Sequence, residues 1–166
     1  MTKIYIILIY KDVIMKLNIN NKYKAVAYNW EQWEFTLKDL LSFSDKTILY
    51  FYPMDDTPWC TIENKDFSSM KDEFKNKWVW LIGVSKDSIE SHKRFIDKYS
   101  LEIDLISDPE LILHNELWVY WEKINYWKKS IWVTRSTFLV DSTWKVIDEW
   151  RNVKATRHVE RILKEI

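Results

Sequence analysis

The stretch Thr47–Thr61, TILYFYPMDDTPWCT, contains the two patterns on which the fold assignment rests. It opens with TILYFY, a run that is apolar or β-branched throughout and is typical of a strand buried on both faces. Thr57 then precedes Pro58, the order expected for a helix N-cap followed by proline at the first helical position. A buried strand therefore leads directly into a helix whose first turn carries Cys60.

Apolar patterns on both sides of this stretch predict alternating strands and helices. Cys60, Phe67 and Phe74 recur every seven residues with Met70 between them, which indicates the inward face of one helix. The other predicted segments are a strand at 79–85, a helix at 89–99 capped by Asp87 and Glu90, a strand at 103–107, a helix at 111–117, a hairpin of 136–140 with 145–153, and a last helix capped by Thr156. This order predicts an α/β fold, a central mixed β-sheet flanked by helices.

Length and composition indicate one globular domain over residues 1–166. The 166 residues are 47% hydrophobic and 30% charged, and no Pro/Gly/Ser-rich linker divides them. Lys plus Arg number 25 and Asp plus Glu number 25, so the formal net charge is zero. Without a basic excess, we expect no binding to nucleic acid and none to a membrane surface.

The N-terminus allows three interpretations. Residues 4–10 form an apolar run far shorter than the roughly 20 residues that cross a bilayer. We expect a buried or edge strand here, because no small-residue cleavage site follows that would mark a secretion signal. The remaining alternative is that Met15 is the true start and that residues 1–14 are a non-native or poorly ordered leader.

The sequence holds 11 tryptophans and a single glycine, where average usage gives about 12 glycines. Several tryptophans stand where the backbone favours glycine. Trp30 follows Asn29 at a turn, Trp78 follows a charged helical stretch, and Trp144 ends the turn that begins at Asp141. The alternative is a tryptophan-rich core, although several of these residues have charged or turn-forming neighbours.

We therefore advance a glycine hypothesis. The organism reads the codon UGA as glycine, whereas the printed sequence translates UGA as tryptophan, so these positions are glycine in the natural protein. The positions concerned are Trp30, Trp33, Trp59, Trp78, Trp118, Trp121, Trp127, Trp132 and Trp144. Trp80 is left undecided, and Trp150, inside a strand-like run, is interpreted as a genuine tryptophan. UGG codons at most of these positions would refute the hypothesis.

Cys60 has a position suited to reactivity. Unpaired backbone N–H groups and the positive end of the helix dipole favour a thiolate in the first turn of a helix. The Thr57 hydroxyl, three residues earlier, can reach the Cys60 backbone or sulfur. The alternative is a buried structural cysteine, and position alone leaves both interpretations open. As the only cysteine, Cys60 excludes an internal disulfide and fits a reducing, cytoplasmic setting.

The segment FYPMDDTPWC resembles the peroxiredoxin signature P-x-x-x-T/S-x-x-C, matched by Pro53, Thr57 and Cys60. With Trp59 read as glycine, DDTPGCT followed by Glu63 resembles the Q-type, or bacterioferritin comigratory, branch. The likeness covers about residues 30–166 and includes IGVSKDSIESHKRF, LISDP, TRSTFLVD and KVIDEWRNVK. It implies a thioredoxin-like fold and a thiol peroxidase that reduces hydrogen peroxide and organic hydroperoxides.

The resemblance also implies roles for matching residues. Cys60 would be the peroxidatic nucleophile that becomes a sulfenic acid, and Thr57 would hydrogen-bond the peroxide and the thiolate. Arg135, in TRSTF, matches the family's active-site arginine, whose charge stabilises the sulfur and the leaving oxygen. Glu63 would orient Arg135, and Pro53 belongs to the same signature loop. The alternatives are a solvated first-turn acid for Glu63 and a surface charge for Arg135.

Two residues depart from the family pattern. Lys65 stands where many Q-type members have a resolving cysteine, so an external thiol, either small or on a thioredoxin-like protein, must resolve the sulfenic acid. Trp59, if genuine, would crowd the peroxide pocket beside Cys60. No cofactor is implied, and His92, His114 and His158 lack metal-ligand spacing, so no metal is expected. The resemblance suggests that the protein is a monomer, and a homodimer is the second possibility.

The sequence also allows two other functions. A thiol–disulfide oxidoreductase normally needs a second cysteine three residues after the first, and Glu63 occupies that position. A non-catalytic thioredoxin-fold binding protein, with Cys60 incidental, is the alternative from another class. The presence of Thr57, Cys60 and Arg135 together favours the peroxidase over both.

Overall fold

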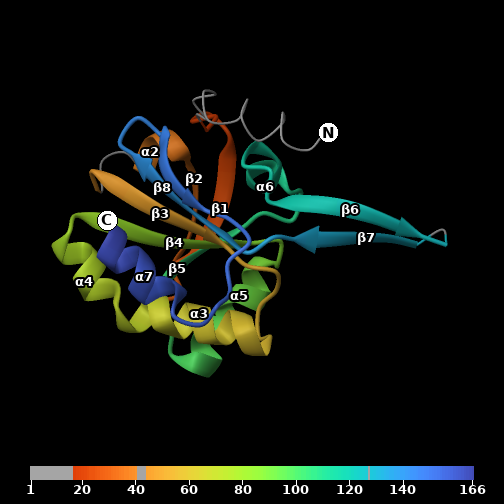
Figure 1. Cartoon of the computed structure of the whole chain (residues 1–166), viewed down its shortest axis with the longest axis horizontal. Coiled ribbons are helices and arrows are strands. Elements are labelled where there is room, and N and C mark those ends of the chain that lie inside the picture. Colours follow the sequence, from red (N-terminus) through yellow and green to blue (C-terminus); the bar gives the residue numbers. More distant parts are fainter. Residues whose placement is uncertain (1–16, 41–43, 127) are drawn as a thin grey trace, which may run out of the picture.

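A mixed seven-stranded sheet forms the centre of the computed structural model, which describes residues 17–40, 44–126 and 128–166 (Figure 1). Its strands lie in the order β2-β1-β5-β4-β3-β8-β9. The bounds are β1 Lys22–Val26, β2 Gln32–Thr36, β3 Lys46–Phe51, β4 Val79–Ser85, β5 Asp104–Ser107, β8 Ser136–Asp141 and β9 Val146–Trp150. Strands β3, β4 and β5 are parallel, and the strands beyond them run antiparallel to their neighbours. The fold is thus α/β with a central mixed sheet, as predicted.

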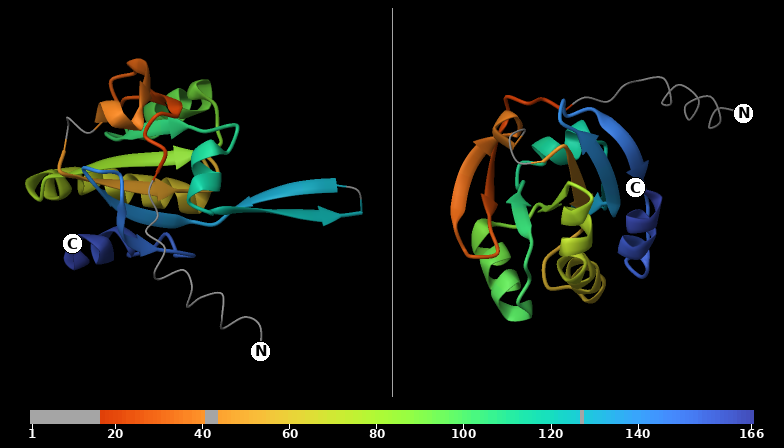
Figure 2. Two further views of the ribbon diagram at one scale, coloured as in Figure 1. Left: turned by 90° about the horizontal axis from the view of Figure 1, so that it is seen from above. Right: turned by 90° about the vertical axis from the view of Figure 1, so that its left-hand side faces the viewer.

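Helices cover both faces of this sheet (Figure 2). One face packs against α3 Pro58–Ser69, α4 Lys71–Asn76, α5 Ile89–Tyr99 and α7 His158–Glu165. The other packs against α2 Leu37–Leu40 and α6 Ile112–Glu116. Because β3 is covered on both faces, Leu49 and Phe51 pack into one core while Ile48 and Tyr50 pack into the other. This explains the uninterrupted apolar run that marked β3 in the sequence.

A second, two-stranded sheet extends away from the body of the molecule (Figure 1). It is the hairpin of β6 Tyr120–Asn125 and β7 Lys128–Val133, which pair with each other in an antiparallel register. Trp121 and Trp132 stack across it with their ring centroids 5.9 Å apart. The hairpin connects α6 to β8, and β8 lies beside β3 in the central sheet.

The structure confirms most of the predicted elements and corrects several boundaries. The predicted first helix is interrupted at Met70 into α3 and α4, although Cys60, Phe67 and Phe74 are all buried as expected. Ser88, not Asp87, caps α5, since its side chain accepts the Ser91 N–H. The N-cap of α7 is Arg157 rather than Thr156, and that cap has no side-chain hydrogen bond.

Other differences concern segments for which no element was predicted. The β1–β2 hairpin and the β6–β7 hairpin were not predicted, and both are well formed. The expected strand at 4–10 and the question of a start at Met15 lie outside the described residues.

Backbone geometry supports the glycine hypothesis at four positions. Trp30, Trp78, Trp118 and Trp144 have φ values of 70°, 60°, 56° and 59°. This left-handed region costs a residue with a side chain roughly 1–2 kcal/mol and costs glycine nothing comparable. Trp144 is also buried, and its indole N–H has no hydrogen-bond partner among the described residues. Four of the tryptophans thus occupy sites that suit glycine.

Two of these positions share one hairpin geometry. Trp30 donates its N–H to the carbonyl of Ala27 at 2.8 Å, and Trp144 donates to that of Asp141 at 2.9 Å. In each case the turn ends in a residue with left-handed φ, which is the three-residue hairpin loop that normally carries glycine. At Trp33, Trp59, Trp121 and Trp132 the backbone φ gives no such reason for glycine, and Trp127 lies outside the described residues.

Candidate active site

Cys60 lies in the first turn of α3, directly beyond the carboxyl end of β3. Thr57 is the N-cap, with extended backbone angles of φ −91° and ψ 151°, and Pro58 occupies the first turn as predicted. The Thr61 N–H closes the first helical hydrogen bond on the Thr57 carbonyl at 2.8 Å. Cys60 is only 1% exposed, so its sulfur faces the interior and not the bulk solvent.

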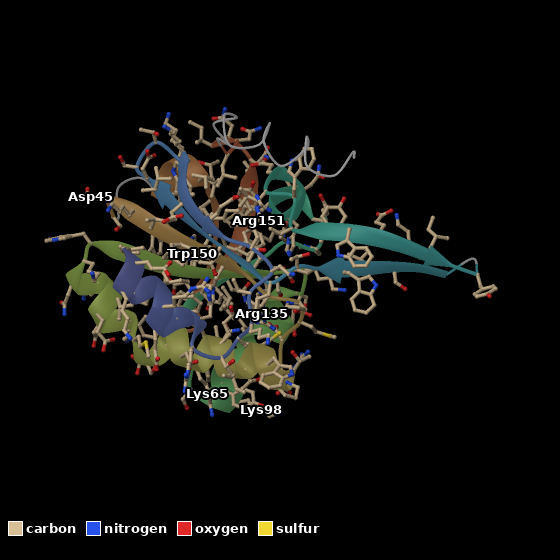
Figure 3. The ribbon with its side chains drawn as sticks, viewed as in Figure 1. Asp45, Lys65, Lys98, Arg135, Trp150 and Arg151 are labelled. Carbon is tan, nitrogen blue, oxygen red and sulfur yellow. The ribbon has the colours of Figure 1, made fainter. Side chains whose placement is uncertain are left out.

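Arg135 reaches Cys60 from the start of β8, the strand next to β3. It immediately precedes β8, which pairs antiparallel with β3 so that Ser136 lies opposite Phe51. The register therefore brings Arg135 to the end of β3 where α3 begins (Figure 3). Its Nη2 donates to the Cys60 Sγ at 3.2 Å, and its Nη1 donates to Glu63 Oε2. Cys60, Glu63 and Arg135 thus form one contact group, which we call the sulfur triad.

The charges of the sulfur triad are buried together. Glu63 is fully buried and Arg135 nearly so. Burial raises the pKa of Glu63 to about 7, although the positive charge of Arg135 acts in the opposite direction. Burial also disfavours the Arg135 charge, but Glu63 and Cys60 outweigh this effect and raise the pKa of Arg135 further. A cation therefore lies beside the sulfur, and Glu63 is not the solvated acid that was the alternative interpretation.

Residues 52–57, between β3 and α3, contain Pro53 and Thr57 of the signature motif, and we call this segment the catalytic loop. Pro53 is half-buried at the start of this loop. The Thr57 hydroxyl donates to the Met54 carbonyl at 3.1 Å and makes no hydrogen bond to the backbone of α3. The expected contact of Thr57 with Cys60 is therefore not formed, because the hydroxyl points back across the loop.

Two residues near Cys60 face outward. Trp59 is 60% exposed, so most of its indole lies on the surface of α3. Lys65 is exposed on the same helix, and its Nζ lies 5.2 Å from the centre of the Tyr99 ring (Figure 3). No second thiol occupies the position of Lys65, which agrees with the single cysteine of the sequence.

Each of the three histidines has its own partner, and sequence reasoning missed what each contacts. His92 pairs with Asp55, His114 pairs with Asp108, and His158 contacts the hydroxyl of Thr137. All three are buried. Among the described residues, no group of three or more His, Cys, Asp or Glu is arranged to hold a metal ion. None of the helices described is long and apolar enough to cross a bilayer.

Comparison with known proteins identifies relatives along most of the chain. Residues 18–149 match the AhpC/TSA family. A Helicobacter pylori protein named as a peroxiredoxin of the bcp type is 47% identical over 77 residues, which are 46% of this chain and 49% of that protein. The chloroplastic peroxiredoxin Q of Sedum lineare is 43% identical over 107 residues, covering 60% of this chain and 58% of the relative. The matched stretches thus span about half the length of these curated relatives.

The fold is shared over a much longer stretch than these alignments. The structure of the Xanthomonas campestris bacterioferritin comigratory protein superposes with a TM-score of 0.79 and 30% identity. The superposition covers 93% of this chain and 96% of that one, and it identifies the fold as thioredoxin-like. Since the family match extends over residues 18–149 and includes Cys60 and Arg135, the chain belongs to the AhpC/TSA family and resembles its Bcp and peroxiredoxin Q members.

Proposed function

We propose that this protein is a thiol-dependent peroxidase that uses Cys60 as its only redox-active residue. The observation that carries the proposal is the guanidinium of Arg135, held by Glu63, at 3.2 Å from the Cys60 sulfur. A buried cation in direct contact with a cysteine stabilises the thiolate, which is the nucleophilic form. The structural study of the Xanthomonas campestris relative concerns alkyl peroxide reduction, and this supports peroxides as the substrate class.

The first chemical step transfers one oxygen atom to Cys60. The thiolate attacks one oxygen of the peroxide, the S–O bond forms, and the O–O bond breaks. The other oxygen leaves as an alkoxide or hydroxide and takes up a proton, so that an alcohol or water is released and Cys60 becomes a sulfenic acid. The sulfur is oxidised by two electrons and the peroxide is reduced by two.

Arg135 acts on this step through its charge. As the O–O bond breaks, negative charge moves from the sulfur to the leaving oxygen, and a fixed cation stabilises that developing charge. Glu63 binds the other terminal nitrogen of Arg135 and so fixes the direction of the guanidinium. Thr57 completes the site once a peroxide is bound, when its hydroxyl turns from the Met54 carbonyl toward the substrate.

The second step returns Cys60 to its reduced state with two external thiols. The first thiol condenses with the sulfenic acid to give a mixed disulfide and water, and the second releases Cys60 and forms a disulfide with the first. Because the Cys60 sulfur is 1% exposed, the first turn of α3 has to open for this thiol to reach it. A small thiol or a thioredoxin-like protein meets this chemical requirement.

The remaining features of the proposal follow from composition and resemblance. The protein acts as a single-domain monomer in a reducing, cytoplasmic compartment, where an unpaired cysteine stays available. Its substrates are hydrogen peroxide and organic hydroperoxides. Neither nucleic acid nor a membrane is part of the function.

Peroxide consumption with dithiothreitol as reductant tests the proposal directly. The native chain should turn over hydrogen peroxide and an alkyl hydroperoxide, and Cys60→Ser should reduce consumption to the level of dithiothreitol alone. A dimedone-type probe should label Cys60 after one equivalent of peroxide. A folded chain that neither turns over nor labels would instead support the non-catalytic binding protein.

A further inference from the structure

Two carboxylates attach the catalytic loop to α5: the exposed one of Asp56 contacts Lys98 and Tyr99, and the buried one is that of Asp55. Three side chains converge on it. Tyr52 donates its hydroxyl to Oδ1 at 2.7 Å, while the Ser91 hydroxyl and the His92 Nδ1 each lie 2.8 Å from Oδ2. Burial raises the pKa of Tyr52 well above its ordinary value, so its hydroxyl keeps its proton and donates. Asp55 therefore accepts three hydrogen bonds, one from Tyr52 within the same loop and two from Ser91 and His92 of α5.

The two ring nitrogens of His92 both face acceptors. Nε2 lies 3.1 Å from the Ile106 carbonyl oxygen, which only accepts, so Nε2 carries a proton. Nδ1 lies 2.8 Å from Asp55 Oδ2, and both side chains are buried. The His92 ring thus links the catalytic loop to the Ile106 carbonyl of β5.

This pair fixes the backbone of the catalytic loop at a point close to the substrate site. The Asp55 N–H donates to Asp87 Oδ2 at 2.9 Å, so both the main chain and the side chain of Asp55 are held. Asp55 lies two residues after Pro53 and two before Thr57. The network that ends at Ile106 of β5 therefore holds the loop midway between Pro53 and Thr57.

We infer that Asp55 and His92 are positioning residues for peroxide reduction, holding the catalytic loop over Cys60 in its reactive geometry. The inference rests on the proposed peroxidase function. Reaction with peroxide needs Thr57, Arg135 and Cys60 in a fixed arrangement, whereas alkylation of the sulfur by iodoacetamide needs only an accessible thiolate. Loosening the loop therefore slows the first reaction and leaves the second unchanged or faster.

The neighbouring His114–Asp108 pair provides a matched control. Its Nδ1 to Oδ2 distance is 2.7 Å, and both side chains are buried like those of His92 and Asp55. Asp108 also accepts the backbone N–H groups of Ile112 and His114 at the start of α6. This second pair secures α6 and makes no hydrogen bond to the catalytic loop, so breaking it changes stability without repositioning Thr57.

The experiment compares the rate constants of Cys60 with peroxide and with iodoacetamide in purified full-length variants. Asp55→Asn should lower the ratio of the two constants by about tenfold or more. His92→Gln, which removes the contact with Asp55 and can reach toward Ile106, should do the same. His92→Asn keeps an N–H near the place of Nδ1 and should stay within about threefold of the native ratio. Ser91→Ala removes one donor only and should lower the ratio about threefold.

Asp108→Asn supplies the control, with an unchanged ratio even where denaturation shows a loss of stability. The inference is wrong if Asp55→Asn or His92→Gln leaves the ratio unchanged in folded protein, or if Asp108→Asn lowers it equally. Failure of the peroxidase proposal looks different, because native protein would then react with iodoacetamide and not with peroxide. The two failures are therefore distinguished by the native protein alone.

Discussion

The surroundings of Cys60 and the turns that hold tryptophan differ in how well their residues fit their positions. In the sulfur triad every buried charge has a partner, and Arg135 contacts both Glu63 and Cys60. In the turns, Trp30, Trp78 and Trp118 adopt a backbone conformation that suits glycine. The residues of the sulfur triad are thus paired with one another, whereas the turns contain strained backbone. Activity per folded molecule and stability should therefore respond to different substitutions.

The largest effect on activity is expected at Arg135. Arg135→Met keeps a long apolar stem and removes the charge beside Cys60, so the rate constant with peroxide should fall about 100- to 1,000-fold. Stopped-flow measurement of Cys60 oxidation gives this rate constant. Arg161→Met, on the exposed side of α7, is the control and should react like the native protein. A fall of less than threefold at Arg135 would contradict the role proposed for its charge.

The turns provide the opposite test, in which stability changes and activity does not. Trp30, Trp78 and Trp118 are more than half exposed, so replacing them by glycine removes strain and loses little packing. We expect a gain of about 1 kcal/mol at each position and about 3 kcal/mol in the triple variant, after allowing for the greater entropy of unfolded glycine. The midpoint temperature of thermal unfolding of the triple variant should rise by about 6–12 °C, and its rate constant with peroxide should be unchanged.

Trp150 is the matched control for the turn tryptophans. It is buried in β9, and its indole N–H donates to Glu165 Oε2 at 2.5 Å. Trp150→Gly should therefore destabilise the protein by at least about 3 kcal/mol, because a large buried side chain and its hydrogen bond are lost. If the three turn substitutions also destabilise the protein, the glycine hypothesis loses its structural support at those positions.

Local sequence patterns predicted the centre of the fold and not its edges. Strands β3 and β4 were found because burial on both faces leaves an apolar run that needs no partner to be recognised. Strand β1, with the sequence KYKAV, mixes charged and apolar residues, and its identity depends on pairing with β2 and β5. The β6–β7 hairpin is still harder to predict, since its strands pair only with each other outside the body.

The same distinction applies to the site. Cys60, Thr57 and Glu63 lie within one short motif, and Arg135 was found through its resemblance to a family segment. The contact of His92 with Asp55 joins residues 37 positions apart, and a histidine on an amphipathic helix carries no sign of its partner. The orientation of Thr57 was also beyond prediction, because either direction of its hydroxyl satisfies a hydrogen bond.

The charge of Glu63 makes stability near the site depend on pH, in contrast to the turns. Its pKa is raised to about 7 in the folded protein from 4.5, so the folded state binds the proton more tightly than the unfolded state. Stability from this group is present below about pH 4.5 and is lost as the pH rises to 7, by about 3 kcal/mol. Urea denaturation at pH 5 and pH 8 should show this loss, and Glu63→Gln should abolish it. The gain of the triple tryptophan variant should be the same at both values.

His158, on α7, gives a dependence of similar size and opposite sign. Burial lowers its pKa to about 4 from 6.5, with Arg161 and Arg135 acting in the same direction. The unfolded chain therefore binds the proton more readily, and stability is lost as the pH falls from 6.5 toward 4, by about 3 kcal/mol. His158→Gln, which keeps an amide near the Thr137 hydroxyl, should flatten the profile in that range. If the native and variant profiles between pH 4 and 6.5 run parallel, acid unfolding is governed by other groups, and the pH dependence of the site region reduces to Glu63.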